Sequence, residues 1–251
     1  MSRQAFDGRA FDGRYAFVSG GSGLIGAAIC RALAAEGAKV VVHANQRLSE
    51  AEAIAEAICA EGGQAKAVSF DITDGEAARQ ALEALSAEET FQIVIHAAGF
   101  SDDGPLAGMS AERWHSVIDV SLNGFFNVVQ PLLLPMLRTR WGRVIAISSL
   151  SGVMGNRGQA NYAAAKSGLH GAIKSLSMEY ASRGITGNVV APGVIATPDT
   201  LAQFNKEKIE TLVPMKRAGT PEEVADLVAF LASDKAGYIS GQIITISGGL
   251  G

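Results

Sequence analysis

A tyrosine and a lysine stand four residues apart, at Tyr162 and Lys166, and Ser149 lies thirteen residues before the tyrosine. On a helix, this spacing places the tyrosine and lysine side chains on one face, one turn apart. A neighbouring ammonium group favours the phenolate form of a tyrosine, whose ordinary pKa is about 10, and so tunes it toward proton exchange at cellular pH. Such a pair is common by itself and mostly structural, so its meaning depends on the elements around it.

Short apolar runs alternate along the chain with longer stretches of helical periodicity. The runs predict strands at 15–19, 39–43, 65–70, 91–96, 143–148, 186–190 and 242–246. The periodic stretches predict helices at 24–36, 49–61, 75–85, 111–137, 161–182 and 221–232. Apolar strands separated by helices indicate a parallel sheet covered on both faces. We predict a single α/β domain with a Rossmann-type, doubly wound, seven-stranded parallel sheet, whose ligand lies beyond the carboxyl ends of the strands.

The two ends of this pattern differ from its middle. Residues 5–9 read AFDGR and residues 10–14 repeat them, so we interpret 1–13 as an N-terminal extension, with the first copy a possible cloning feature, and 14–251 as the domain. After the sixth strand, Pro198 and Pro214 surround a short polar helical piece. We expect the stretch at about 196–215 to be a mobile lid over the substrate.

Composition narrows the class of protein. The 251 residues carry a net charge of −4 with a pI of about 5.6, which provides no overall basic field for nucleic acid or an anionic membrane. Cys30 and Cys59 lie in helical apolar patterns and are expected to be buried small hydrophobes rather than a disulfide or metal site. The start shows no signal-peptide core and no segment shows an uninterrupted membrane-length apolar run, so we expect a cytoplasmic enzyme.

A glycine cluster follows the first strand and opens a helix. Gly20, Gly23 and Gly26 there would let the backbone approach a pyrophosphate, whose charge is stabilised by N–H groups at the helix N-terminus. Asp71 and Ile72 follow the third strand and are expected to contact the adenine. The alternative is a role in the N-terminal cap of the next helix, and the two roles can coexist.

The end of the second strand bears on the choice between NAD and NADP. It carries no carboxylate before Glu50, and Asn45 and Arg47 are suited to holding a 2′-phosphate. An exposed Arg47 that binds nothing is the alternative. We therefore favour NADPH over NADH.

Four motifs together resemble the short-chain dehydrogenase/reductase family over residues 14–251. They are the glycine turn, Ser149 after the fifth strand, Asn161–Lys166, and the stretch from Asn188 to Gly193. Within that family, the stretches 154–162, 182–185 and 220–223 look most like β-ketoacyl-acyl-carrier-protein reductases.

The resemblance implies a role for each site residue. Tyr162 would donate a proton to the substrate carbonyl oxygen as hydride arrives from the nicotinamide, Ser149 would hydrogen-bond that oxygen, and Lys166 would lower the tyrosine pKa and bind the nicotinamide ribose. The cofactor would contact Gly20, Ser22, Gly23, Leu24, Ile25, Gly26, Asn45, Arg47, Asp71, Ile72, Ala98, Gly99, Tyr162, Lys166, Pro192, Gly193, Ile195 and Thr197.

Several positions depart from the family pattern. His96 stands where relatives have asparagine, and we expect it to satisfy backbone groups at the strand end rather than to titrate. Ser121 replaces the family's catalytic asparagine, which holds a water beside the lysine, so Ser121 must substitute through its main-chain carbonyl or otherwise. Leu24 replaces a usual glycine, and Gly23 stands where many NADP-dependent relatives carry arginine, which weakens the case for NADP without reversing it.

The resemblance also implies partners. Arg140 and Arg183 correspond to arginines that dock acyl carrier protein, an acidic partner, near the active-site entrance. Small residues on the helix after Tyr162 permit close helix packing, and we expect a homotetramer. The alternatives are a reductase or dehydrogenase of a small free alcohol or ketone, and a non-catalytic nucleotide-binding member of the family.

Overall fold

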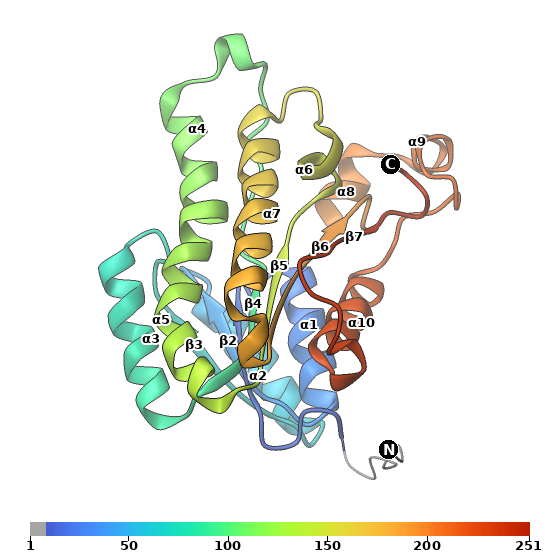
Figure 1. Ribbon diagram of the computed structural model, residues 1–251. Coiled ribbons are helices and arrows are strands. Elements are labelled where there is room, and N and C mark those ends of the chain that lie inside the picture. Colours follow the sequence, from blue (N-terminus) through green and yellow to red (C-terminus); the bar gives the residue numbers. More distant parts are fainter. Residues whose placement is uncertain (1–8) are drawn as a thin grey trace.

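The computed structural model describes residues 9–251, apart from the side chains of residues 199 and 203 (Figure 1). Its sheet has seven parallel strands in the order β3-β2-β1-β4-β5-β6-β7. The strands are β1 (Tyr15–Ser19), β2 (Lys39–Ala44), β3 (Gln64–Ser69), β4 (Phe91–His96), β5 (Gly142–Ile147), β6 (Ile185–Pro192) and β7 (Ile243–Ile246). The predicted α/β, Rossmann-type fold is confirmed. The strand order reverses between β1 and β4, so the switch point where such sheets bind ligands lies there.

Helices cover both faces of the sheet (Figure 1). One face carries α1 (Leu24–Ala35), α2 (Leu48–Ala60) and α10 (Pro221–Ala232), and the other carries α3 (Gly75–Glu88), α5 (Gly124–Thr139) and α7 (Ala160–Tyr180). Each helix layer packs against one face of the sheet in its own apolar cluster, and the strand backbones lie between the two clusters. Burial on both faces explains why the central strands read as continuous apolar runs rather than alternating ones.

The single helix predicted at 111–137 is two helices joined by an irregular segment. α4 (Ala111–Ile118) and α5 are separated by a π-helical segment, Asp119–Asn123. The whole stretch Ala111–Thr139 is long and apolar enough to match a membrane span by composition. Val128, Leu132 and Met136 of α5 are, however, buried against the sheet, and a core helix passes the same test of length and hydropathy.

The expected burial of both cysteines is corrected, whereas the boundary of the expected extension at 1–13 stays a prediction. Phe11, placed in the extension, is fully buried in the cluster under α1, and its N–H donates to the Glu36 carbonyl at 2.8 Å. The packed structure therefore begins before residue 14, because this aromatic ring completes the core; residues 5–8 of the first copy lie outside the described part. Cys59 is exposed near the end of α2, whereas Cys30 is buried as expected.

The stretch at about 196–215 forms two short helices, α8 (Pro198–Gln203) and α9 (Lys206–Leu212), beside the carboxyl end of β6. Thr197 caps α8 by accepting a hydrogen bond from the Thr200 N–H at 3.2 Å. Ile209 and Val213 are buried, which anchors the far end of the segment. Its movement as a lid stays a prediction.

Candidate active site

The first turn of α7 positions Tyr162, and Asn161 holds that turn in place. The Asn161 amide donates to the carbonyls of Asp102 at 3.0 Å and Arg113 at 3.2 Å, and its oxygen accepts from the Tyr162 N–H at 2.8 Å. Asn161 is fully buried. It thereby joins the loop after β4, α4 and α7 at one point. The sequence did not assign it this role, and its place beside the tyrosine was the only signal.

Ser149 and Tyr162 meet at the carboxyl end of β5. Ser149 directly precedes the short helix α6 (Leu150–Met154), and its hydroxyl accepts from the Ser151 N–H at 3.1 Å. Burial raises the pKa of Tyr162, and a hydrogen bond with the Ser149 side chain opposes that rise. The expected lowering of the tyrosine pKa by Lys166 is therefore not seen, and the largest influence on this pKa is burial, which raises it. A tyrosine that stays protonated is a proton donor.

Lys166 lies one turn further along α7, as its spacing predicted. Its Nζ donates to the Ile147 carbonyl at 2.9 Å and lies 5.7 Å from the centre of the Tyr162 ring. The lysine is 3% exposed, and burial lowers its pKa from 10.5 to about 8. Its charge is thus held close to the tyrosine at a point where solvent does not screen it.

His96 and Ser121 face each other behind this centre. His96 Nε2 contacts the Ser121 carbonyl oxygen at 3.0 Å, and His96 Nδ1 contacts the Ser19 hydroxyl at 2.9 Å. The expectation that His96 satisfies a backbone group at the strand end is confirmed. Ser121 belongs to the π-helical segment, an irregularity that recurs at functional sites in helices.

A cavity of about 420 Å³ opens beside this centre, at the switch point between β1 and β4. Nine of the predicted cofactor residues line it: Gly20, Ser22, Gly23, Asn45, Arg47, Asp71, Ile72, Ala98 and Gly99. The other predicted contacts do not line it: Leu24, Ile25, Gly26, Tyr162, Lys166, Pro192, Gly193, Ile195 and Thr197. Leu24 is about half exposed. Pro192 ends β6, and Gly193, Ile195 and Thr197 follow it.

The glycine turn fits the pyrophosphate of a nicotinamide dinucleotide. No side chain caps the N-terminus of α1, and its first turn carries no acidic residue, so its N–H groups are available to an anion. Gly20 has a φ of 68°, and a β-carbon on Gly26 would lie 2.2 Å from the Gly20 carbonyl oxygen. Only glycine at both positions permits this close packing of turn against helix.

His43 also lines the cavity, although the sequence did not single it out. Its Nδ1 accepts from the Gly20 N–H at 3.4 Å, and its Nε2 contacts the Phe70 carbonyl at 2.9 Å. A carbonyl only accepts, so Nε2 carries the proton, and burial lowers the pKa of His43 to about 4. The neutral ring thus holds the glycine turn against the end of β3. A polar residue at the end of an apolar strand was the available signal.

The residues around the adenosine end show competing contacts. Asp71 accepts from the Thr73 N–H and hydroxyl, both at 2.8 Å, while Asp74 caps α3. Asp71 therefore orders its own turn while facing the cavity. Arg47 forms an exposed ion pair with Glu50 at 2.9 Å.

The predicted docking arginines lie far from Tyr162 in the same chain. Arg140 ends α5 and Arg183 follows α7, and the Arg140 guanidinium reaches the Ser182 carbonyl at 3.5 Å. Each stands two residues before a strand, β5 or β6, so both lie at the amino ends of the strands, whereas Tyr162 lies at the carboxyl ends. Along the 21 residues of α7 the separation is roughly 30 Å. A single chain does not bring these arginines to its own active-site entrance.

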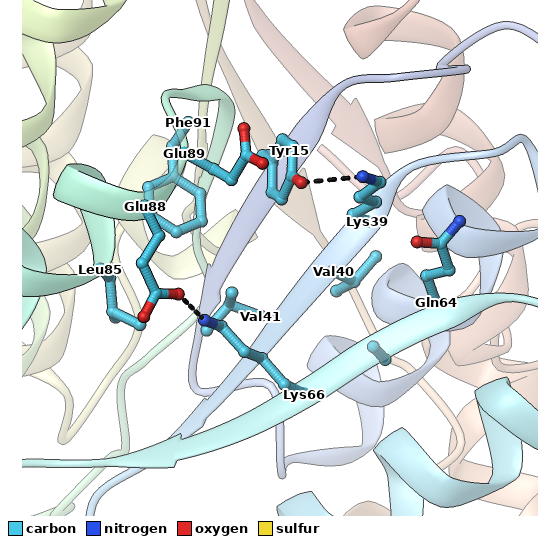
Figure 2. A pocket seen from close by; sticks show the side chains of 11 residues that line it. Tyr15, Lys39, Val40, Val41, Gln64, Lys66, Leu85, Glu88, Glu89 and Phe91 are labelled. Atoms are coloured by element: carbon cyan, nitrogen blue, oxygen red, sulfur yellow. Dashed lines mark hydrogen bonds and ion pairs between the residues drawn. The ribbon is translucent and has the colours of Figure 1, made fainter.

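A second cavity, of about 310 Å³, lies at the amino ends of the first four strands (Figure 2). Both of its lysines have partners, Lys39 Nζ with the Tyr15 hydroxyl and Lys66 Nζ with Glu88, both at 2.8 Å. It is separated from Ser149 and Tyr162 by the length of the sheet. The chemistry therefore belongs at the opposite end.

Comparison with known proteins agrees with this geometry. A family model described as enoyl-(acyl carrier protein) reductase matches residues 21–251. A protein of Escherichia coli is 43% identical over 96% of this chain and 98% of its own length, and one of Synechocystis is 42% identical over the same shares. One of Aggregatibacter actinomycetemcomitans is 41% identical over 93% and 97%. All three are described as 3-oxoacyl-(acyl-carrier-protein) reductases. The chain therefore belongs to the short-chain dehydrogenase/reductase family, and it is an oxidoreductase that acts on alcohol and carbonyl groups with a nicotinamide cofactor.

Proposed function

We propose that this enzyme uses NADPH to reduce a 3-oxoacyl thioester, carried on acyl carrier protein, to the 3-hydroxyacyl thioester. The observation that carries the proposal is the pair of neighbouring hydroxyls, Ser149 and Tyr162, beside a buried lysine and a cavity suited to a dinucleotide. Two hydroxyls that converge on one point suit a carbonyl oxygen, which accepts two hydrogen bonds, better than a carbon–carbon double bond.

Ser149, Tyr162 and Lys166 each have a separate role in the reaction. A bound nicotinamide supplies the hydride to the carbonyl carbon. Ser149 donates a hydrogen bond that fixes the carbonyl oxygen, and Tyr162 gives its phenolic proton to that oxygen as negative charge develops there. Lys166 stabilises the phenolate left on Tyr162, and its short distance from the ring supports this role. Solvent then reprotonates the site before the next turnover.

The preference for NADPH rests on Asn45 and Arg47, which line the cavity where no carboxylate follows β2. The competing Arg47–Glu50 ion pair is exposed, with the Arg47 side chain 60% and the Glu50 side chain 48% accessible. Exposed pairs of this kind contribute at most about 1 kcal/mol, so a 2′-phosphate, which carries up to two negative charges, can displace Glu50.

The carrier protein is proposed to dock on Arg140 and Arg183 of one copy and to deliver its substrate to Tyr162 of another. The separation of roughly 30 Å within a chain supports delivery between copies. An assembly, which we propose to be a homotetramer, is supported by exposed apolar side chains on α5, where Phe126 is 63% and Leu134 is 66% exposed. Of the small residues on α7, Gly171 faces open space, whereas Gly168 packs on Leu122 within the chain.

Loss of NADPH absorbance with acetoacetyl thioesters tests the proposal. Turnover should occur with both the carrier-linked and a small soluble thioester. The double variant Arg140→Glu/Arg183→Glu should raise KM for the carrier-linked substrate by tenfold or more, because charge reversal repels an acidic partner. KM for the small thioester should stay unchanged. No turnover of either thioester would refute the proposed substrate, and equal effects on both would refute docking.

A further inference from the structure

Ser148, which stands directly before Ser149, carries a hydroxyl that the chemistry described so far does not use. Its side chain is buried at the point where the carboxyl end of β5 leads into α6. The Ser148 N–H donates to the Val190 carbonyl at 2.7 Å, so the backbone of this turn is bonded to β6. The hydroxyl makes its own contacts with a different element, α7.

Two groups on α7 meet this hydroxyl. Ser148 Oγ lies 3.0 Å from the Lys166 carbonyl oxygen and 2.8 Å from His170 Nε2. Lys166 and His170 are one helical turn apart, so both contacts fall on the same face of α7. A β-carbon on Gly152 would lie 2.9 Å from Ser148 Oγ and 2.9 Å from the Lys166 carbonyl carbon. The hydroxyl and α6 therefore lie tightly against the backbone of α7.

For both contacts to be hydrogen bonds, the protons of this cluster have one arrangement. A carbonyl oxygen only accepts, so the single hydroxyl proton of Ser148 goes to Lys166. The serine oxygen then accepts, and His170 Nε2 carries the proton between them. Burial and the Lys174 ammonium lower the pKa of His170, so its ring is neutral at neutral pH and donates from this nitrogen. The Ser148 hydroxyl is thus a donor and an acceptor at once, and both of its partners belong to α7.

These bonds join the two elements that carry the reacting hydroxyls. Ser149 follows Ser148 directly at the end of β5, and Tyr162 lies one turn before Lys166 on α7. The Ser148 hydroxyl thus holds one element against the other beside the site itself. A misplacement of about 1 Å in such an arrangement lowers the rate about 100-fold, so a bond at this point bears directly on turnover.

We propose that Ser148 and His170 are positioning residues, which tie the end of β5 to α7 and so set the distance between the Ser149 and Tyr162 hydroxyls. The inference rests on the proposed function, because these two hydroxyls are the groups that bind and protonate the carbonyl oxygen there. Ser148 and His170 do not contact the substrate in this role. They act through the backbone that carries the reacting groups.

Steady-state kinetics with NADPH and an acetoacetyl thioester test the tie. Ser148→Ala removes both hydrogen bonds and should lower kcat by about tenfold or more. KM for NADPH should stay unchanged, because Ser148 is not among the described residues that line the cofactor cavity. His170→Leu should lower kcat in the same way, whereas His170→Gln keeps an N–H donor and should restore most of it. The double variant Ser148→Ala/His170→Leu should be no slower than Ser148→Ala, since both changes break one unit.

Ser177→Ala is the matched control. The Ser177 hydroxyl is also buried on α7, and it contacts the carbonyls of Ile173 at 2.9 Å and of Gly187, on β6, at 3.0 Å. It therefore ties the same helix to a strand, but roughly 20 Å further along α7 than Tyr162. Ser177→Ala should lower the free energy of unfolding about as much as Ser148→Ala and leave kcat unchanged. Equal kcat values for these two variants would overturn the inference.

A second measurement needs no substrate. Enzyme labelled with ¹³C at the tyrosine ζ-carbons gives one resonance for each of its four tyrosines, and Tyr162→Phe identifies the one from Tyr162. The Ser149 side chain is a hydrogen-bond partner of this phenol, so Ser148→Ala should displace the resonance in the direction that Ser149→Ala does. Ser177→Ala should leave it in place. An undisplaced resonance in Ser148→Ala would also overturn the inference. Absent thioester turnover by the natural protein, with the displacement intact, would refute the proposed substrate alone.

Discussion

Replacing Lys166 by methionine should make the protein more stable at neutral pH while it abolishes turnover. The lysine is 3% exposed, and burial lowers its pKa from 10.5 to about 8. At about 1.4 kcal/mol per pKa unit, keeping this charge buried costs about 3 kcal/mol. Methionine fills a similar volume without charge, but it loses the hydrogen bond to the Ile147 carbonyl, worth about 1–2 kcal/mol. We therefore expect the free energy of unfolding to rise by about 1–2 kcal/mol.

The pH dependence has a definite sign. The unfolded chain keeps the Lys166 proton up to its ordinary pKa of 10.5, whereas the folded chain loses it near 8. Between those values the unfolded state binds more protons, so the stability of the natural protein rises with pH. Below the pKa that Lys166 has in the folded protein, the buried charge lowers the free energy of unfolding by its full cost. Near pH 10 about 1 kcal/mol of this cost remains. The stabilising effect of Lys166→Met should accordingly shrink as pH rises.

Urea denaturation followed by circular dichroism measures this difference at about pH 7 and about pH 10, at one protein concentration because assembly would contribute to stability. Lys206→Met is the matched control, because its side chain is 89% exposed and carries no burial cost. A lower free energy of unfolding for Lys166→Met at neutral pH, or a gain that does not change with pH, would refute the reasoning.

Three further changes test other parts of the structure. Tyr162→Phe should lower kcat by about 10²–10⁴-fold with an unchanged circular dichroism spectrum, because the proton donor is lost; near-normal turnover would contradict its role. Arg47→Ala should lower the ratio of kcat/KM for NADPH to that for NADH by about tenfold or more, since one charged contact is removed; an unaltered ratio would count against Arg47 as the phosphate ligand. Phe11→Ala should lower the free energy of unfolding by about 3–5 kcal/mol in urea, as expected for a fully buried ring; a small loss would return Phe11 to the extension.

The fold could be predicted because its signals are local and repeated. Apolar runs separated by helical periodicity predicted all seven strands, and the glycine turn, Ser149 and the Tyr162/Lys166 pair fall at the strand and helix ends where the structure has them. What could not be predicted depends on distance through space. Asn161 joins three elements, and His96 meets Ser121 across 25 positions in sequence, so neither contact has a local pattern.

Two other differences concern properties that residue spacing and sequence similarity do not reveal. Spacing predicted that Lys166 lies close to Tyr162, but it did not reveal that burial raises the tyrosine pKa. Sequence similarity pointed to Arg140 and Arg183 as a pair, and they do lie near each other. Their distance from Tyr162 follows from the length of α7, because one end of that helix carries the tyrosine and the other leads to Arg183.

The π-helical segment that contains Ser121 restricts insertions and deletions in this part of the chain. Each residue of an α-helix turns the chain by about 100°, so one inserted or deleted residue between Asp119 and Asn123 would rotate α4 by that angle relative to α5. Ser121 would then leave His96, and the Arg113 carbonyl would leave Asn161. We expect length variation to be tolerated in surface loops such as the one before α9 and to be eliminated here, where helix register sets the active-site geometry.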